Sequence, residues 1–318
     1  MRLKIVVTGG CGYIGSALVP KLLADGHRVR VIDAMWFGRN LPTHPNLDVV
    51  RYDLRGGKAP VEDAEAIIHL AAIANDPCGE LDAKLTWEVN VLATTRLAQR
   101  AVAFGVKQFI FASSASIYGI KENRPVTEDE SFEPVSDYNK TKLCGERALL
   151  SFRDAMAVQI VRPATVCGVS PRMRLDVIVN LLTMQALETG RLVAHCGAHG
   201  GKLMRPHCHI DDMVDLYRWL LARQEQRGPF NAGFENLSVG EIAETIQRHL
   251  PETRVEFTEV ADKRSYAVDS SLLRRAGFSP RFSVNTAVEQ IVAAHKAGLR
   301  REPRSINLEW MRSQWIAA

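Results

Sequence analysis

Apolar and polar positions follow two periods along the first half of the chain. Short apolar runs, each followed by a stretch with apolar residues three or four positions apart, predict strands that alternate with helices. The predicted strands are 3–7, 28–32, 48–52, 66–70, 108–112 and 158–161, and the predicted helices are 13–24, 83–104 and 137–152. This alternation implies a parallel sheet with right-handed crossovers and helices on both faces.

The regular alternation ends after residue 162. The later apolar patterns predict helices over 175–188 and 210–223, and a further helix that begins at Ser238. Glu241 follows this serine by three residues, which completes a capping box. We therefore expect a smaller, mixed α/β lobe in the second half of the chain.

Composition and charge exclude several classes of protein. The chain of 318 residues is 46% apolar, enough to bury a full core. Its net charge of +4 is spread without a long basic block, so we expect no nucleic-acid partner. No apolar run reaches the ~18–20 residues that cross a bilayer, and the run after Lys4 is too short for a signal peptide. The six cysteines show no CxxC spacing, so a cytoplasmic protein with reduced thiols is expected.

A glycine-rich turn follows the first predicted strand. Residues 8–15 read TGGCGYIG and fit the dinucleotide patterns G-x-G-x-x-G and G-x-x-G-x-x-G. Glycine allows a tight turn, close approach of a pyrophosphate and close helix–strand packing, while the helix N-terminus attracts phosphate. Asp33 ends the second strand near the offset of about 20 residues at which an acid binds the ribose hydroxyls. No adjacent arginine is present to bind a 2′-phosphate, which favours NAD over NADP.

Three further residues suggest oxidation of a hydroxyl group. Tyr138 and Lys142 form Tyr-x-x-x-Lys on a predicted helix, so their side chains share a face. Tyrosine, with a pKa of about 10, becomes a usable base when an ammonium group and a positive nicotinamide ring stabilise the phenolate. Ser114 follows the fifth strand, at the sheet edge that faces the ligand crevice. We predict Tyr138 as the base, Lys142 as its partner and Ser114 as the hydroxyl that binds the substrate oxygen.

These segments resemble the extended short-chain dehydrogenase/reductase superfamily, in its NAD-dependent epimerase/dehydratase branch. Further matches are HLAA at 69–72, SSASIYG at 113–119, RPATVCG at 162–168 and RPHCHIDDM at 205–213. The resemblance implies an α/β fold: a Rossmann-type doubly wound parallel sheet with a smaller mixed α/β substrate lobe. It also implies these cofactor-binding residues: Gly9, Gly12, Tyr13, Ile14, Gly15, Asp33, Asp53, Leu54, Leu70, Ala71, Ala72, Asn90, Tyr138 and Lys142.

The resemblance is to sugar-nucleotide enzymes of the UDP-galactose 4-epimerase type, which implies a nucleotide sugar as substrate. The substrate-binding residues would be Asp76, Ser114, Ser116, Thr165, Asn180, Arg205 and Arg264. Asp76 fits a cap of the long helix equally well. Arg264 is proposed in place of a diphosphate arginine that the family has and this chain lacks. Ala115 and Ser116 stand where the family's dehydratases carry an acid pair, so dehydration is disfavoured.

We expect the chain to divide into two lobes, because the regular alternation ends after residue 162. Residues 1–164 would form the NAD-binding domain, with 206–233 crossing back to it, and 165–205 and 234–318 would form the substrate lobe. Relatives dimerise through the helices that correspond to 83–104 and 137–152, so a homodimer is expected.

Histidines and cysteines near residue 200 invite a metal site, but we predict none. His195 and Cys196 are neighbours on an extended segment, where adjacent side chains point to opposite faces and do not converge on one ion. His195 or His199 could contact the substrate instead, and His209 occupies an ordinary family position.

The leading function is NAD-dependent epimerisation of a sugar nucleotide, by transient removal and return of a hydride at a carbinol carbon. An alternative with the same Ser-Tyr-Lys site is a net NAD-dependent oxidoreductase, either a keto-sugar reductase or a sugar or sugar-acid dehydrogenase. An alternative of another class is a non-catalytic NAD-sensing scaffold. The intact Ser114, Tyr138 and Lys142 argue against the scaffold.

Overall fold

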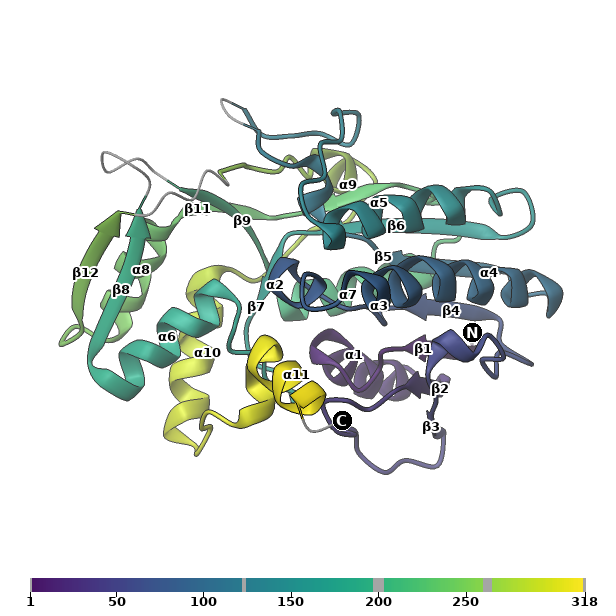
Figure 1. The fold of residues 1–318 in the computed structure, drawn as a ribbon, viewed down its shortest axis with the longest axis horizontal. Coiled ribbons are helices and arrows are strands. Elements are labelled where there is room, and N and C mark those ends of the chain that lie inside the picture. Colours follow the sequence, from purple (N-terminus) through teal and green to yellow (C-terminus); the bar gives the residue numbers. More distant parts are fainter. Residues whose placement is uncertain (1, 122–123, 197–202, 260–264, 317–318) are drawn as a thin grey trace.

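A parallel seven-stranded sheet forms the centre of the computed structural model, which describes residues 2–121, 124–196, 203–259 and 265–316 (Figure 1). The strand order is β10-β6-β5-β4-β1-β2-β3, and every neighbouring pair is parallel. The strands are β1 (Lys4–Thr8), β2 (Arg28–Asp33), β3 (Leu47–Arg51), β4 (Ala66–His69), β5 (Gln108–Ala112), β6 (Ala157–Pro163) and β10 (Phe230–Ala232). The predicted doubly wound sheet is confirmed.

Helices cover both faces of this sheet because its strands alternate their side chains. In β1, Ile5 and Val7 pack with α1 (Tyr13–Ala24) and α7 (Ile210–Leu221). Val6 points to the other face and packs in the core that includes α4 (Ala93–Ala103) and α5 (Asp137–Leu150). Burial on both faces accounts for the nearly continuous apolar runs that predicted the strands.

The predicted helix over 83–104 is interrupted. The structure has α3 (Ala83–Trp87), a π-helical turn over Glu88–Leu92 and then α4. A π-turn adds one residue to a turn, so the apolar spacing of 3.6 residues cannot predict it. Asn90 lies in this turn, and its amide group bonds to both the N–H and the C=O of Ile73, which fixes the loop after β4.

The smaller lobe lies on the left in Figure 1 and contains two small sheets. In one sheet β9 (Met204–His209) pairs with β7 (Thr165–Cys167) in parallel and with β11 (Glu235–Ser238) antiparallel. In the other, β8 (Arg191–Cys196) pairs with β12 (Arg254–Glu259). Their core includes residues of α6 (Ile178–Thr189), α8 (Val239–His249) and α10 (Val284–Lys296). The expected mixed α/β lobe is therefore confirmed.

Three further α-helices are α2 (Asp76–Gly79), α9 (Ser271–Arg275) and α11 (Asn307–Ile316). The C-terminal helix α11 contacts α2 and is drawn between α10 and α1 in Figure 1. Within the described residues, no helix combines the length and the apolar character needed to span a membrane.

Candidate active site

A cavity of about 650 Å³ opens where β1, β2, β4 and β5 end. Ligands of open α/β sheets bind at this carboxyl edge. Side chains of the smaller lobe form the opposite wall. The predicted residues that line the cavity are Gly9, Gly12, Tyr13, Ile14, Gly15, Asp33, Asp53, Leu54, Leu70, Ala71, Ala72, Asp76, Ser114, Ser116, Tyr138, Lys142, Thr165 and Arg205.

Two glycines of the glycine-rich turn, Gly9 and Gly15, leave no room for a side chain. Gly9 has φ +70°, and a Cβ there would lie 2.6 Å from the backbone N of Ala71. A Cβ on Gly15 would lie 2.5 Å from the Cα of Gly10. Helix α1 begins directly after Gly12 with no side-chain cap and no acid in its first turn. Its first N–H groups and positive end are thus left for an anion at the cavity, which fits the diphosphate of a dinucleotide.

The Asp33 side chain is fixed at the end of β2 by two hydrogen bonds from backbone N–H groups. Its carboxylate accepts hydrogen bonds from Cys11 N at 2.9 Å and Met35 N at 2.7 Å. Burial raises the pKa of Asp33, while these two backbone bonds oppose that rise. Each carboxylate oxygen keeps a further lone pair, and the residue lines the cavity, so it can accept hydrogen bonds from ribose hydroxyls.

Ser114, Tyr138 and Lys142 come together at the end of β5. Ser114 Oγ lies 2.7 Å from Ser116 Oγ, which donates to Asn139 Oδ1 at 2.6 Å. Tyr138 hydrogen-bonds to Ser114. The Lys142 Nζ lies 6.0 Å from the centroid of the Tyr138 ring. The sequence therefore predicted a set of side chains that the fold assembles in one place.

Contacts with β5 hold the Lys142 side chain near the ring of Tyr138. Its Nζ donates to the carbonyl O of Ala112 at 2.8 Å and lies 5.1 Å from the centroid of the Phe111 ring. Burial lowers the pKa of Lys142 to about 7. An anion bound in the cavity would favour the ammonium form, so the charge of this lysine is sensitive to ligand binding.

Charged side chains near Tyr138 act on its pKa in opposite directions. Burial raises the pKa of Tyr138, and the charge of Asp76 adds to that rise. The hydrogen bond to Ser114 and the charge of Arg174 lower it. Asp76 also accepts a hydrogen bond from the hydroxyl of Ser136, the N-cap of α5. The start of the helix that carries Tyr138 is thus tied to α2.

Two predicted residues do not line the cavity, and a third lies outside the described residues. Asn90 is 2% exposed and bonds to the backbone of Ile73. Asn180 is fully buried, with its amide bonded to Gly168, Arg174 and the hydroxyl of Tyr13. Arg264 belongs to the undescribed segment 260–264.

The helix-capping alternative for Asp76 is wrong. Asp82 caps α3 instead, and its carboxylate accepts from Leu85 N at 2.9 Å. Asp76 is the first residue of α2, whose cap is Asn75. The two caps, Asn75 and Asp82, lie seven positions apart because α2 is a separate turn that the apolar pattern did not reveal.

A charged group in the loop between β7 and α6 was not predicted from the sequence. Arg174 Nε donates to Asp176 Oδ1 at 2.7 Å, and Asn75 Nδ2 donates to Asp176 Oδ2 at 3.3 Å. Arg172, Arg174 and Asp176 all line the cavity, together with Asn307 from α11. The only local signal is the unusual density of charge in the segment RMRLD.

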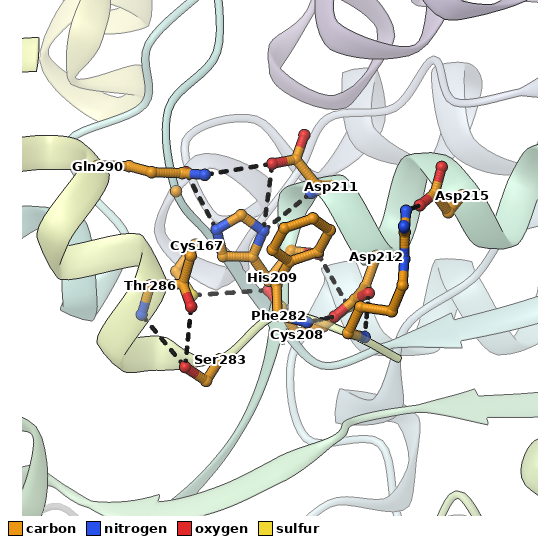
Figure 2. A network of polar contacts seen from close by, with 12 residues as sticks. Cys167, Cys208, His209, Asp211, Asp212, Asp215, Phe282, Ser283, Thr286 and Gln290 are labelled. Atoms are coloured by element: carbon orange, nitrogen blue, oxygen red, sulfur yellow. Dashed lines mark hydrogen bonds and ion pairs between the residues drawn. The ribbon is translucent and has the colours of Figure 1, made fainter. Parts of the chain in front are cut away.

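His209 has a structural role, as Figure 2 shows. Its Nδ1 accepts from Asp211 N at 3.1 Å, and its Nε2 lies 3.1 Å from Gln290 Oε1. The ring stacks on Phe282 with centroids 5.0 Å apart. These contacts join β9 and α7 to α10.

No group of three or more metal-ligating side chains occurs among the described residues. His195 pairs with Thr258 at 2.6 Å, away from the residues that line the cavity. His199 and the side chain of Cys196 lie outside the description.

Several known proteins are similar to this chain in sequence and fold. A UDP-glucose 4-epimerase of Mycolicibacterium smegmatis is 33% identical over 261 residues, which span 78% of this chain and 80% of that protein. MoeE5, solved in complex with UDP-glucuronic acid and NAD, is 28% identical with a TM-score of 0.80, over 92% of this chain and 99% of that one. A UDP-glucuronic acid 4-epimerase from Bacillus cereus, solved with UDP-glucuronic acid and NAD, is 25% identical with a TM-score of 0.82, over 93% and 99%.

The family model for the NAD dependent epimerase/dehydratase family matches residues 5–233. That family is NAD-dependent, as the glycine-rich turn and Asp33 predicted, and its members are enzymes. This chain belongs to the NAD dependent epimerase/dehydratase family.

Proposed function

We propose that this chain is an epimerase of a nucleotide-linked sugar, which oxidises and then re-reduces one carbinol carbon. The observation that carries the proposal is the meeting of Ser114, Tyr138 and Lys142 in the same cavity as the glycine-rich turn. Two of the relatives described above are named as 4-epimerases of UDP-sugars. When bound, NAD would accept the hydride from the carbinol carbon and return it to the same carbon.

The side chains of this site manage the proton and the position of the substrate oxygen. Tyr138 Oη accepts the proton of the sugar hydroxyl, and Ser114 Oγ donates a hydrogen bond to the same oxygen as it becomes a carbonyl. The ammonium form of Lys142 stabilises the phenolate through its charge. When the carbonyl is reduced from its other face, Tyr138 gives the proton back.

The far wall of the cavity supplies charged groups for the sugar nucleotide. Arg205 lines the cavity from β9 and Thr165 from the neighbouring β7. A guanidinium group matches two oxygens of a diphosphate as a fork. Arg174 lies close enough to Tyr138 to affect its pKa, which suits an anionic or hydroxyl-rich sugar near the reacting carbon.

Hydride return is the simplest chemistry that these residues support. Dehydration needs an acid beside Ser114, but Ala115 is buried and apolar, and Ser116 Oγ is bonded to Asn139. A net oxidoreductase would use the same three residues and remains the second candidate. Its cofactor would have to leave after each turnover, whereas an epimerase retains it.

A deuterium experiment separates these reactions. Substrate labelled at the reacting carbon is expected to give epimerised product with the deuterium retained and with no net absorbance at the NADH band. Stoichiometric NADH after addition of substrate and excess NAD would identify a dehydrogenase. Loss of deuterium to solvent would indicate proton abstraction next to a carbonyl. Either outcome would refute the proposed reaction.

We also propose a homodimer formed through α4 and α5. Leu92 at the start of α4 is 49% exposed and Leu150 at the end of α5 is 37% exposed. Such large apolar side chains on neighbouring helices suit a contact with a second copy. Light scattering after size-exclusion chromatography should give twice the monomer mass, and Leu92→Glu should shift it toward the monomer. A parent protein of monomer mass would contradict this assembly.

A further inference from the structure

Arg172 is a buried cation that lines the cavity and has no carboxylate partner among the described residues. It is 5% exposed, and its Nε is buried without a hydrogen-bond partner in that part of the chain. Arg174, two residues later, is paired with Asp176. A desolvated cation is costly unless an anion compensates for its charge. The arrangement of Arg172 therefore calls for a bound anion.

The position of Arg172 indicates which anion that is. Its backbone N donates to Ser16 Oγ, in the first turn of α1, at 3.1 Å. Its guanidinium lies 4.2 Å from the centroid of the Phe37 ring, in the loop after β2. The charge of Arg172 also lowers the pKa of Asp33. These two contacts and this charge effect place Arg172 beside the glycine-rich turn and Asp33, which form the dinucleotide side of the cavity.

The C-terminal segment, residues 302–316, holds this guanidinium. Nη2 of Arg172 donates to the carbonyl O of Arg304 at 3.0 Å and to Oδ1 of Asn307. Asn307 N also donates to Asp176 Oδ2 at 3.3 Å. Both acceptors thus approach from beyond residue 302, more than a hundred positions along the chain from the arginine that they orient.

Helix α11 is itself anchored over the dinucleotide side. Trp310 Nε1 donates to the carbonyl O of Trp36 at 2.7 Å. Met311 packs in a cluster with Ile73, Cys78 and Leu85. The segment therefore joins the loop after β2 to α2 and α3 across the cavity.

We propose that Arg172 binds the diphosphate of the dinucleotide, and that the C-terminal segment positions it through Asn307 and Arg304. The inference extends the proposed function, because an enzyme that returns a hydride must retain its reduced cofactor until the second half of the reaction. A guanidinium fork that spans two phosphate oxygens adds affinity and also fixes the register of the diphosphate. Asn307 is a positioning residue in this scheme, since it acts through Arg172.

Calorimetry of the full chain with NAD, ADP, UDP and adenosine tests the proposal. For Arg172→Gln we expect NAD and ADP to bind about 10- to 100-fold more weakly, the usual effect of a lost hydrogen bond to a charged group. Adenosine, which lacks phosphate, should bind as to the parent. Arg312→Gln on the exposed side of α11 removes the same charge outside the cavity and should change nothing.

A double-mutant cycle tests the role of Asn307. Asn307→Ala should weaken ADP binding less than Arg172→Gln does, and it should add no further loss in the double variant. Unchanged ADP affinity in Arg172→Gln, an equal loss for adenosine, or a loss confined to UDP would each overturn the proposal. If Arg172→Gln does not fold, Arg172→Lys and Asn307→Ala carry the same comparison. Because ADP binding requires no turnover, this result is independent of whether the chain proves to be an epimerase.

Discussion

The two walls of the cavity are built in different ways. The dinucleotide wall consists of backbone that turns within residues 8–15 and of Asp33, which accepts bonds from Cys11 and Met35 nearby. The opposite wall includes the paired side chains of Arg174 and Asp176, which Asn75 and Asn307 hold. Asn307 also holds Arg172, which reaches from the same loop to the dinucleotide side. The first wall is fixed by local sterics and the second by contacts between distant segments.

This difference separates general binding from specificity. A backbone cradle accepts any dinucleotide diphosphate, because every residue of the turn offers the same N–H group. Side chains that meet from separate segments can differ between relatives without disturbing the sheet. We therefore expect the wall around Arg174 and Asn307 to decide which sugar binds and how long the cofactor stays.

The largest effect should come from Tyr138, which lies where the two walls meet. Tyr138→Phe removes one hydroxyl and should lower turnover about 10²- to 10⁴-fold, the usual share of a general base, while NAD binding is retained. Steady-state kinetics with the epimerised substrate and calorimetry with NAD measure the two quantities. Parent-like turnover would show that Tyr138 is not the base. Loss of NAD binding together with turnover would show that Tyr138 serves cofactor binding as well as catalysis.

The dinucleotide wall should be sensitive to any side chain that is added to its glycine-rich turn. Gly15→Ala places a Cβ 2.5 Å from Gly10 Cα and Gly9 O, so we expect a loss of about 1–3 kcal/mol in the free energy of unfolding and weaker NAD binding. Gly240→Ala is the matched control, also in the first turn of a helix, where a Cβ would have its nearest neighbour at 3.8 Å. It should be neutral or slightly stabilising, because alanine favours helix. Denaturation of both variants that gave equal changes would refute the steric argument.

Local signals explain why one wall was predictable. The glycines of the turn and Asp33 stand at fixed offsets from strands that the apolar runs reveal, so their neighbours follow from the fold class. Ser114, Tyr138 and Lys142 were predictable for a related reason. The end of β5 and one face of α5 must meet at the sheet edge once the sheet is parallel.

The other wall has no such signal in the sequence. Arg172 and Asn307 are in contact although no local sequence pattern links them. The helix α11, which carries Asn307, was not predicted from the apolar pattern. Asn180 and Asn90 were placed by resemblance, but their amides are bonded within the protein behind the cavity surface. Whether a polar side chain points into the cavity or into the protein interior depends on packing, and the sequence pattern does not encode that packing.

The smallest effect, and the sharpest test of the second wall, concerns the pH dependence of kcat/KM. The charge of Arg174 lowers the pKa of Tyr138 and that of Asp76 raises it, so removing each charge should act in opposite directions. In Arg174→Gln the pKa of Tyr138 rises, less phenolate is present at a given pH, and the ascending limb should move to higher pH. In Asp76→Asn the pKa of Tyr138 falls and the same limb should move to lower pH, while the amide oxygen can still accept a hydrogen bond from Ser136.

The pH profile of kcat/KM reports these pKa values because kcat/KM reflects the unliganded enzyme. The control variant Arg312→Gln should leave the ascending limb unmoved. Shifts of the same sign in both variants would show that structural damage, rather than charge, links this wall to the base.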